Sequence, residues 1–165
     1  MANLALWLAA RFIPARAGIR ELQAVQAMLI SDVASTLLRS DPEHGAALLR
    51  EAFSNFGRTM GETLKMRFRV RPTLSDLAAA WRAVCNLAGV KYKISREADR
   101  VVFAHPACPL WEEFSRRRLN CSETCLPMIT ALSQVIAPQA QVELLRPPDS
   151  SGPCVKAIFL KENQT

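Results

Sequence analysis

The chain has 165 residues, 50% of them apolar, and carries a formal net charge of +6. This length favours one domain with one hydrophobic core, and a composition without low-complexity stretches argues against a disordered chain. The basic residues are spread widely, with dense runs only at 65–71 and 115–118, so we do not expect a nucleic-acid partner.

The N-terminal stretch MANLALWLAARFIPARAG is apolar, but it is too short to span a bilayer and Arg11 and Arg16 interrupt it. It also lacks the basic start of a secretory signal. We therefore expect a cytoplasmic protein without a transmembrane segment, whose first helix is amphipathic and covers the core or a partner. An interfacial membrane helix is the alternative. The apolar face of this helix comprises Leu4, Trp7, Leu8, Phe12 and Ile13.

Two long helices are predicted next, because apolar residues recur every three or four positions over residues 17–39 and again over residues 43–68. Asp41 is suited to cap the second helix, with the proline after it in the first helical position. Gly57 and Gly61 lie four residues apart on one face, which favours close packing against another helix over access for a ligand. The apolar positions of the first helix are Ile19, Leu22, Val25, Met28, Leu29, Val33 and Leu37.

A third helix is predicted between Thr73 and Gly89. Thr73 and Asp76 resemble a capping box in which Asp takes the usual place of Glu. Gly89 is suited to end the helix, because glycine adopts the left-handed backbone conformation without strain. Cys85 lies on the apolar face and is interpreted as a small buried residue.

Beyond Gly89 the apolar period changes from helical to alternating. Residues 90–105 are typical of a hairpin, residues 119–137 of a helix, and residues 141–147 with 154–161 of a second hairpin. This order of elements indicates an antiparallel sheet.

The predicted fold class is α+β, in which an N-terminal helical layer packs on a small antiparallel sheet and one C-terminal helix carries the metal-site cysteines. We expect a single domain over residues 1–165. Residues 1–89 are expected to be mainly helical, and residues 90–165 to form hairpin, helix and hairpin with a cysteine cluster.

The chain has five cysteines, and no convincing secretion signal accompanies them, so we expect free thiols or thiolates rather than disulfides. Two strand ends can converge on the start of a covering helix, and thiolates are ligands that zinc and iron bind. We therefore predict a zinc site, with iron as an alternative metal and with His105 or Glu143 as a replacement ligand or a general base. A redox or nucleophilic cysteine and a set of inert core thiols are the other interpretations. The predicted metal ligands are Cys108, Cys121, Cys125 and Cys154.

A predicted helix start determines where Cys121 and Cys125 lie. Asn120 is interpreted as the N-cap and Glu123 as its capping-box partner. Cys121 then lies in the first turn, and Cys125 lies four residues on, on the same face. A helix N-terminus favours the thiolate form, which is the form that binds metal.

The stretch from VVFAHPACPL to GPCVKAIFL resembles the 4-vinyl-reductase-like superfamily of small-molecule-binding domains, and within it the methanogen-output-type and L-2-amino-thiazoline-4-carboxylic acid hydrolase-like domains. The resemblance implies an α+β domain, usually dimeric, with a zinc site near a largely apolar pocket. The shared pattern is a cysteine after a strand, a helix cysteine, a strand Glu, a Gly-containing turn and a final strand cysteine: Cys108, Cys125, Glu143, Gly152 and Cys154.

The match to the phenol-sensing relatives is incomplete. In those relatives the metal is held by a helix Cys, a strand Glu, a Cys three residues later and the final Cys. Arg146 stands at the third of these positions here. Cys108 and Cys121 are the candidates for the missing ligand. The hydrolase-like branch implies opening of a small heterocycle by a cysteine or a metal-bound water, although the chain has only two histidines and no Ser-His-Asp order.

Three functional hypotheses follow. The first is a zinc-stabilised, sensor-like domain that binds a small apolar or aromatic molecule and forms a homodimer. The second is a metal- or thiol-dependent hydrolase of a small heterocyclic substrate, with His105 or Glu143 as general base. The third is a redox sensor in which Cys121 and Cys125 respond to oxidation. The candidate residues of the apolar pocket are Trp111, Phe103, Trp81, Phe56 and Met60.

Overall fold

The computed structural model describes residues 15–117, 119–148 and 154–161. The predicted first helix, with Leu4, Trp7, Leu8, Phe12 and Ile13, lies outside these residues, as does Gly152. The elements follow in the order α2 (Ala15–Ser40), α3 (Gly45–Phe68), α4 (Leu74–Leu87), β1 (Lys91–Arg96), β2 (Arg100–Ala107), α5 (Pro109–Arg116), α6 (Cys125–Ile136), β3 (Ala140–Arg146) and β4 (Cys154–Leu160).

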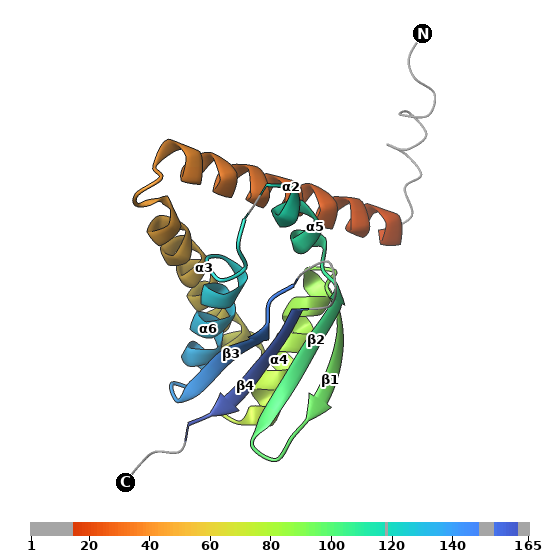
Figure 1. Cartoon of the computed structure of the whole chain (residues 1–165). Helices are drawn as coiled ribbons and strands as arrows, with labels where there is room; N and C mark the ends of the chain where they lie inside the picture. The colour runs from red at the N-terminus through yellow and green to blue at the C-terminus, as the bar shows by residue number, and fades with distance from the viewer. Residues whose placement is uncertain (1–14, 118, 149–153, 162–165) are drawn as a thin grey trace.

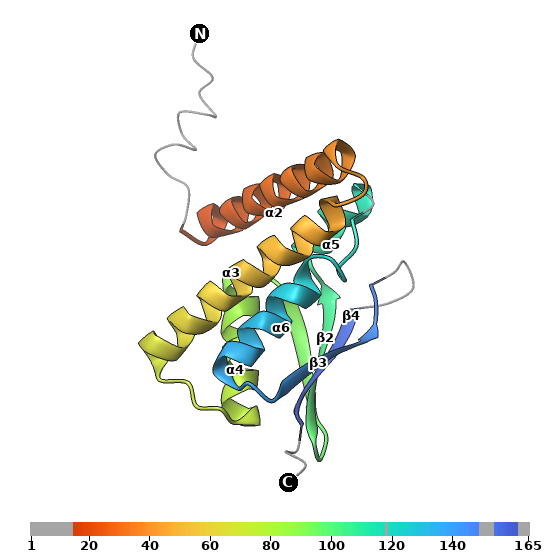
Figure 2. The same ribbon diagram turned by 90° about the vertical axis from the view of Figure 1, so that its left-hand side faces the viewer.

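The four strands form one antiparallel sheet in the order β1-β2-β4-β3. Figure 2 shows the helices α4 and α6 on one side of this sheet, with α3 packed on the outside of α6. Helix α2 lies across one end of the molecule beside α3 and α5 (Figure 1). The predicted α+β fold, with helices on a small antiparallel sheet, is therefore confirmed. No helix in the described part of the chain has the length and apolar character needed to cross a membrane.

The main core lies between the sheet and the helices α4 and α6. Phe103 on β2 is fully buried, and its ring centroid lies 5.0 Å from that of Trp81 on α4. The indole of Trp81 donates a hydrogen bond of 2.8 Å to the Ser133 hydroxyl on α6, so the polar end of this large side chain is satisfied. The other members of this core include Leu77, Leu132, Ile136, Ala140 and Ile158.

Close packing of α3 against α6 depends on two glycines. A Cβ atom on Gly57 would lie 2.1 Å from the Met128 carbonyl oxygen, and one on Gly61 would lie 2.9 Å from the Leu132 carbonyl oxygen. The prediction that Gly57 and Gly61 serve helix packing is therefore confirmed. The close approach fixes α6, and with it the cysteine at its start, against the helical layer.

The predicted boundaries of α4 are also confirmed. Thr73 is the N-cap, and its hydroxyl accepts a hydrogen bond of 3.2 Å from the Asp76 backbone N–H. The Asp76 carboxylate accepts from the Arg71 backbone N–H and pairs with the Arg71 guanidinium. Gly89 has a φ of 67°, in the left-handed region where glycine is favoured.

Two predicted helix starts are wrong. Asp41 does not cap α3; its carboxylate accepts a hydrogen bond from the His44 backbone N–H within a turn, and α3 begins at Gly45. Asn120 is not the N-cap of α6, because its side chain accepts from the Ser122 backbone N–H two residues on. Such a bond favours a turn over a helix, and α6 begins only at Cys125.

Helix α5 was not among the predicted elements. It begins at Pro109, which suits a first helical position, directly after Cys108. Its Phe114 is fully buried in a second, smaller core beneath α2, together with Leu49, Leu119, Cys121 and Cys125. This second core places α5 and the start of α6 side by side.

Candidate functional site

The register of β2 and β4 brings polar side chains to the covered face of the sheet. His105 pairs with Cys154, and Phe103 pairs with Lys156, so these four side chains lie on one face. Phe103 is part of the main core, and His105, Cys154 and Lys156 are all buried. His105 and Phe103 therefore share the covered face of β2. The face also carries a charged residue that the sequence analysis did not consider.

Lys156 is the centre of the site. It is only 5% exposed, and its Nζ lies 2.8 Å from the Cys154 Sγ. Among the described residues no Asp or Glu forms an ion pair with it. Burial alone would lower the pKa of Lys156, but the nearby sulfurs of Cys125 and Cys154 favour the charged form and raise it. An ammonium group in this position therefore requires anionic sulfur beside it, because burial of an unpaired charge is costly.

Cys121 and Cys125 form the second part of the site. The Cys121 thiol donates a hydrogen bond to the Cys125 sulfur, which raises the pKa of Cys121 and lowers the pKa of Cys125. Lys156 and the Thr124 side chain favour the Cys125 thiolate further. Cys125 is also the first residue of α6, where the helix dipole stabilises a negative charge. Within this pair, these effects favour the proton on Cys121 and the negative charge on Cys125.

His105 is a buried side chain with incomplete hydrogen bonding. It is 6% exposed, and within the described residues neither Nδ1 nor Nε2 makes a hydrogen bond of good geometry, although a weaker contact with the Lys91 backbone favours the protonated ring. Burial, and then the positive charge of Lys156, lower the pKa of His105 to about 4, so the ring is neutral at pH 7. Its ring stacks on Phe103 at a centroid distance of 6.2 Å. A neutral imidazole has one unprotonated nitrogen and is a competent metal ligand.

The remaining cysteines lie around this centre. Cys108, directly before α5, interacts electrostatically with both Cys125 and Lys156. Burial raises its pKa to about 11. Cys85 on α4 also lies within electrostatic range of Lys156, and burial raises its pKa to about 11 as well. The structure therefore gathers all four predicted metal ligands near Lys156, and adds Cys85 at the margin.

Glu143 is not brought to this site. It pairs with Ala157, which alternates with Lys156 along β4, so Glu143 lies on the opposite face of the sheet from Cys154. Its side chain is exposed and forms an ion pair of 3.8 Å with Arg100. Glu143 is therefore available neither as a ligand nor as a base beside His105.

The residues predicted to line an apolar pocket do not lie together in one pocket. Trp81 and Phe103 are core residues, Met60 packs against the same core, and Phe56 is exposed on α3. Trp111 lies partly buried against the core that contains Cys121 and Cys125. Two surface hollows, of about 520 and 310 Å³, are lined by other residues, among them Tyr92 and Pro106 in the larger and Arg58 and Leu126 in the smaller.

The potential metal-ligand atoms lie in one region but do not surround a common point. Within the described residues, no three His, Cys, Asp or Glu side chains stand in an arrangement that could hold a metal ion. The contacts instead join the groups two by two: Cys121 with Cys125, and Cys154 with Lys156. A metal would therefore have to draw these pairs together.

No protein-family model matches the chain, and no curated protein matches it either. The resemblance to the 4-vinyl-reductase-like superfamily accordingly stays a prediction from the sequence. The cluster of cysteines, His105 and Lys156 is the feature of the described residues that points to a function.

Proposed function

We propose that this chain binds a soft metal ion, zinc first and iron second, at the buried cysteine cluster, and that the metal stabilises the domain. The observation that carries the proposal is the buried His105 ring, which makes no hydrogen bond of good geometry, lies opposite Cys154 in the sheet and is close to the buried Lys156 ammonium. Cys121 and Cys125 lie within electrostatic range of the same ammonium. Buried polar groups are normally satisfied, so an orphaned imidazole in a sulfur-rich site points to a missing partner.

The burial of the thiols also supports a metal over a reactive cysteine. Cys121, Cys125 and Cys154 are all buried. Cysteines that react with substrates or oxidants are partly exposed, whereas thiolates of structural metal sites are enclosed. A structural metal site is therefore the use of these cysteines that best fits their burial.

Charge balance favours a particular set of ligands. A divalent ion held by three thiolates and a neutral imidazole carries one net negative charge, which the Lys156 ammonium would neutralise. Four thiolates would leave one negative charge uncompensated in a buried site. We therefore assign Cys121, Cys125, Cys154 and His105 as ligands, with Cys108 as the alternative fourth ligand. Zinc would supply stability here, since thiolate binding by the metal favours the folded chain.

The proposal is tested by titrating the reduced, metal-free chain with Co²⁺ under anaerobic conditions and recording the sulfur-to-cobalt charge-transfer absorption. We expect saturation at about one equivalent and marked loss of affinity in Cys121→Ser, Cys125→Ser and Cys154→Ser. Cys85→Ser is the matched control and should bind as wild type. Comparison of His105→Ala with Cys108→Ser identifies the fourth ligand. Absence of thiolate–cobalt absorption in the wild type would contradict the proposal.

A dithiol redox site is the second candidate, and the hydrogen bond between Cys121 and Cys125 favours it. Peroxide would oxidise the two thiols to a disulfide, with two hydrogens lost from the protein and the peroxide reduced to water. If the chain as purified carries no metal and loses about two mass units at these two cysteines with peroxide, the redox role replaces the metal site. No contact in the described residues favours the hydrolase hypothesis, because Glu143 lies on the other face and no described carboxylate pairs with His105.

A further inference from the structure

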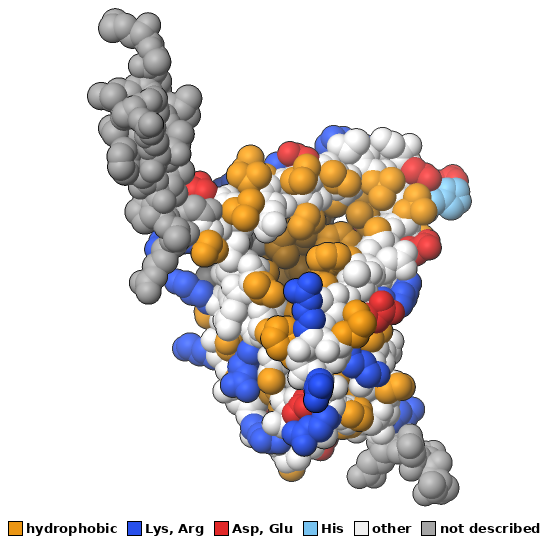
Figure 3. Space-filling view, turned by 180° about the vertical axis from the view of Figure 1, so that it is seen from behind, with side chains coloured by type: hydrophobic (Ala, Val, Ile, Leu, Met, Phe, Trp, Pro, Cys, Tyr) orange, Lys and Arg blue, Asp and Glu red, His pale blue; other side chains and the backbone are white. Residues whose placement is uncertain are grey.

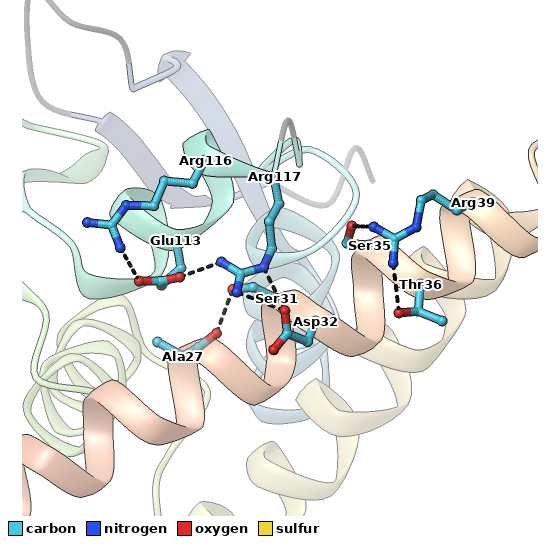
Figure 4. Close-up of polar contacts among 9 residues, drawn as sticks. All are labelled: Ala27, Ser31, Asp32, Ser35, Thr36, Arg39, Glu113, Arg116 and Arg117. Carbon is cyan, nitrogen blue, oxygen red and sulfur yellow. Dashed lines mark hydrogen bonds and ion pairs between the residues drawn. The ribbon is translucent and has the colours of Figure 1, made fainter.

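Helix α2 is attached to the molecule through its small residues. Its buried side chains are Ala27, Ser31, Ala34 and Ser35, which lie against α3 and α5. Figure 4 shows the polar contacts on this side, where Arg117 reaches from the end of α5 to the Asp32 carboxylate at 2.8 Å. Arg117 also pairs with Glu113 of α5. These contacts fix the side of α2 that faces the molecule.

The opposite side of α2 carries exposed large apolar residues. At 100° per residue, Leu22, Val25, Leu29 and Val33 point away from the side with Ala27 and Ser31. Figure 3 shows hydrophobic side chains along α2 and in the hollow between α2 and α3. The exposed apolar side chains of α2, between 47% and 62% exposed, are Ile19, Leu22, Val25, Met28, Leu29 and Val33.

Three apolar residues of α2, Ile30, Leu37 and Leu38, pack against the second core, as in an ordinary surface helix. The six exposed apolar residues add a second apolar side that this molecule's own core does not cover. An apolar stripe of this size on a folded chain marks an interaction surface. The sequence spacing correctly identified the apolar positions of α2, but of these only Leu37 packs against the core. The stripe therefore needs a partner.

The size and charge of the stripe fit a second copy of the chain. At roughly 100 Å² for each half-exposed side chain, the six residues of α2 offer about 600 Å² per copy, or about 1,200 Å² in total, which is the lower end of the range for a specific interface. The stripe itself contains no charged residue, as is typical of interface centres. Helix α2 also lies at one end of the molecule (Figures 1 and 2), so a second copy can approach it.

We propose that two copies of this chain form a dimer in which their α2 helices pack antiparallel along this stripe. Antiparallel packing about a twofold axis lets the same patch meet itself and sets the two helix dipoles in opposite directions. The stripe runs from Ile19 to Val33, so its midpoint, Gln26, lies at the twofold axis. The proposal is independent of the metal site, because α2 contributes no ligand to it.

The test uses the full chain and sedimentation equilibrium over a range of concentrations. We expect a dimer in the wild type, and Leu29→Glu should weaken its association at least tenfold. Leu87→Glu, at a leucine on α4 that is 72% exposed against 62% for Leu29, is the matched control and should remain dimeric. A monomeric wild type would overturn the proposal, whether the stripe is left bare or is covered by the apolar residues 1–14 of the same chain. A dimer insensitive to Leu29→Glu would also overturn it.

Cross-linking tests the arrangement in the same dimer. Gln26→Cys should form a disulfide between copies on mild oxidation, because the two residues meet at the axis. Thr36→Cys, equally exposed on the same helix, lies ten residues further on and should not, since an antiparallel pair separates its two copies by about 30 Å. Cross-linking at Thr36 as well as Gln26 indicates a parallel pair and overturns the proposed packing.

Discussion

The packing of α3 on α6 predicts a large effect from one added methyl group at Gly57. Substitution Gly57→Ala places a Cβ at 2.1 Å from the Met128 carbonyl oxygen, where ordinary contacts exceed 3.4 Å. Alanine favours a helix over glycine by about 1 kcal/mol, but overpacking against backbone costs about 1–3 kcal/mol or more. Because the clash is with backbone and not with a flexible side chain, we expect a net loss at the upper end, about 2 kcal/mol.

The measurement is the free energy of unfolding from urea denaturation, with the thermal midpoint as a second readout. A loss of about 2 kcal/mol corresponds to about 4–8 °C for a chain of this size. Gly61→Ala, with its nearest contact at 2.9 Å, should lose less. Glu62→Ala, exposed on the same helix, should change little and is the control. A Gly57→Ala chain as stable as wild type, or more stable, would show that α3 and α6 do not approach this closely.

Three further predictions concern the caps, the core and the metal. Thr73→Ala removes the hydroxyl that accepts from the Asp76 backbone N–H and should cost about 1 kcal/mol in urea denaturation, whereas Thr73→Ser should restore most of it. Trp81→Phe removes the donor to Ser133 and should cost about 1–3 kcal/mol, measured in the same way; an unchanged free energy would show that this hydrogen bond does not contribute. Chelation of the purified chain should lower the thermal midpoint and added zinc should restore it, and neither treatment should affect Cys125→Ser.

Local signals were sufficient for much of the fold. The end of α4 at Gly89 and its start at Thr73 follow from residues that act on their own neighbours, so the sequence predicts them directly. The hairpins follow from alternation, which fixes the covered face of β2 and hence the position of His105. The glycine pair of α3 could be read as a packing site because only tight contact explains two glycines within a helix.

The errors arise where two local structures compete or where the tertiary structure decides. Asn120 satisfies a capping pattern, but its side chain closes a turn at Ser122 and α6 starts later. The apolar stripe of α2 has the spacing of a core helix, yet only packing could show that it faces outward. A periodic pattern identifies which residues share a face, not what that face contacts.

Lys156 is the residue of the site that the sequence analysis missed. Its signal was available: it lies two positions from Cys154 in a strand whose alternate residue Ile158 is apolar, so all three share the covered face. A lysine at such a position is expected to have an anionic partner. The residues beside Lys156 are cysteines and not Asp or Glu. Sulfur is therefore expected to carry the negative charge that balances the lysine.

The most direct test of the account is the metal content of the chain, purified anaerobically without chelators and measured by mass spectrometry of the elements. We expect about one zinc or iron per chain in the wild type and in Cys85→Ser, and little in Cys125→Ser and Cys154→Ser. A wild-type chain that is folded, fully reduced and free of stoichiometric metal would contradict the proposed site. The buried cysteine cluster would then be stabilised only by the hydrogen bond between its thiols and by the Lys156 ammonium.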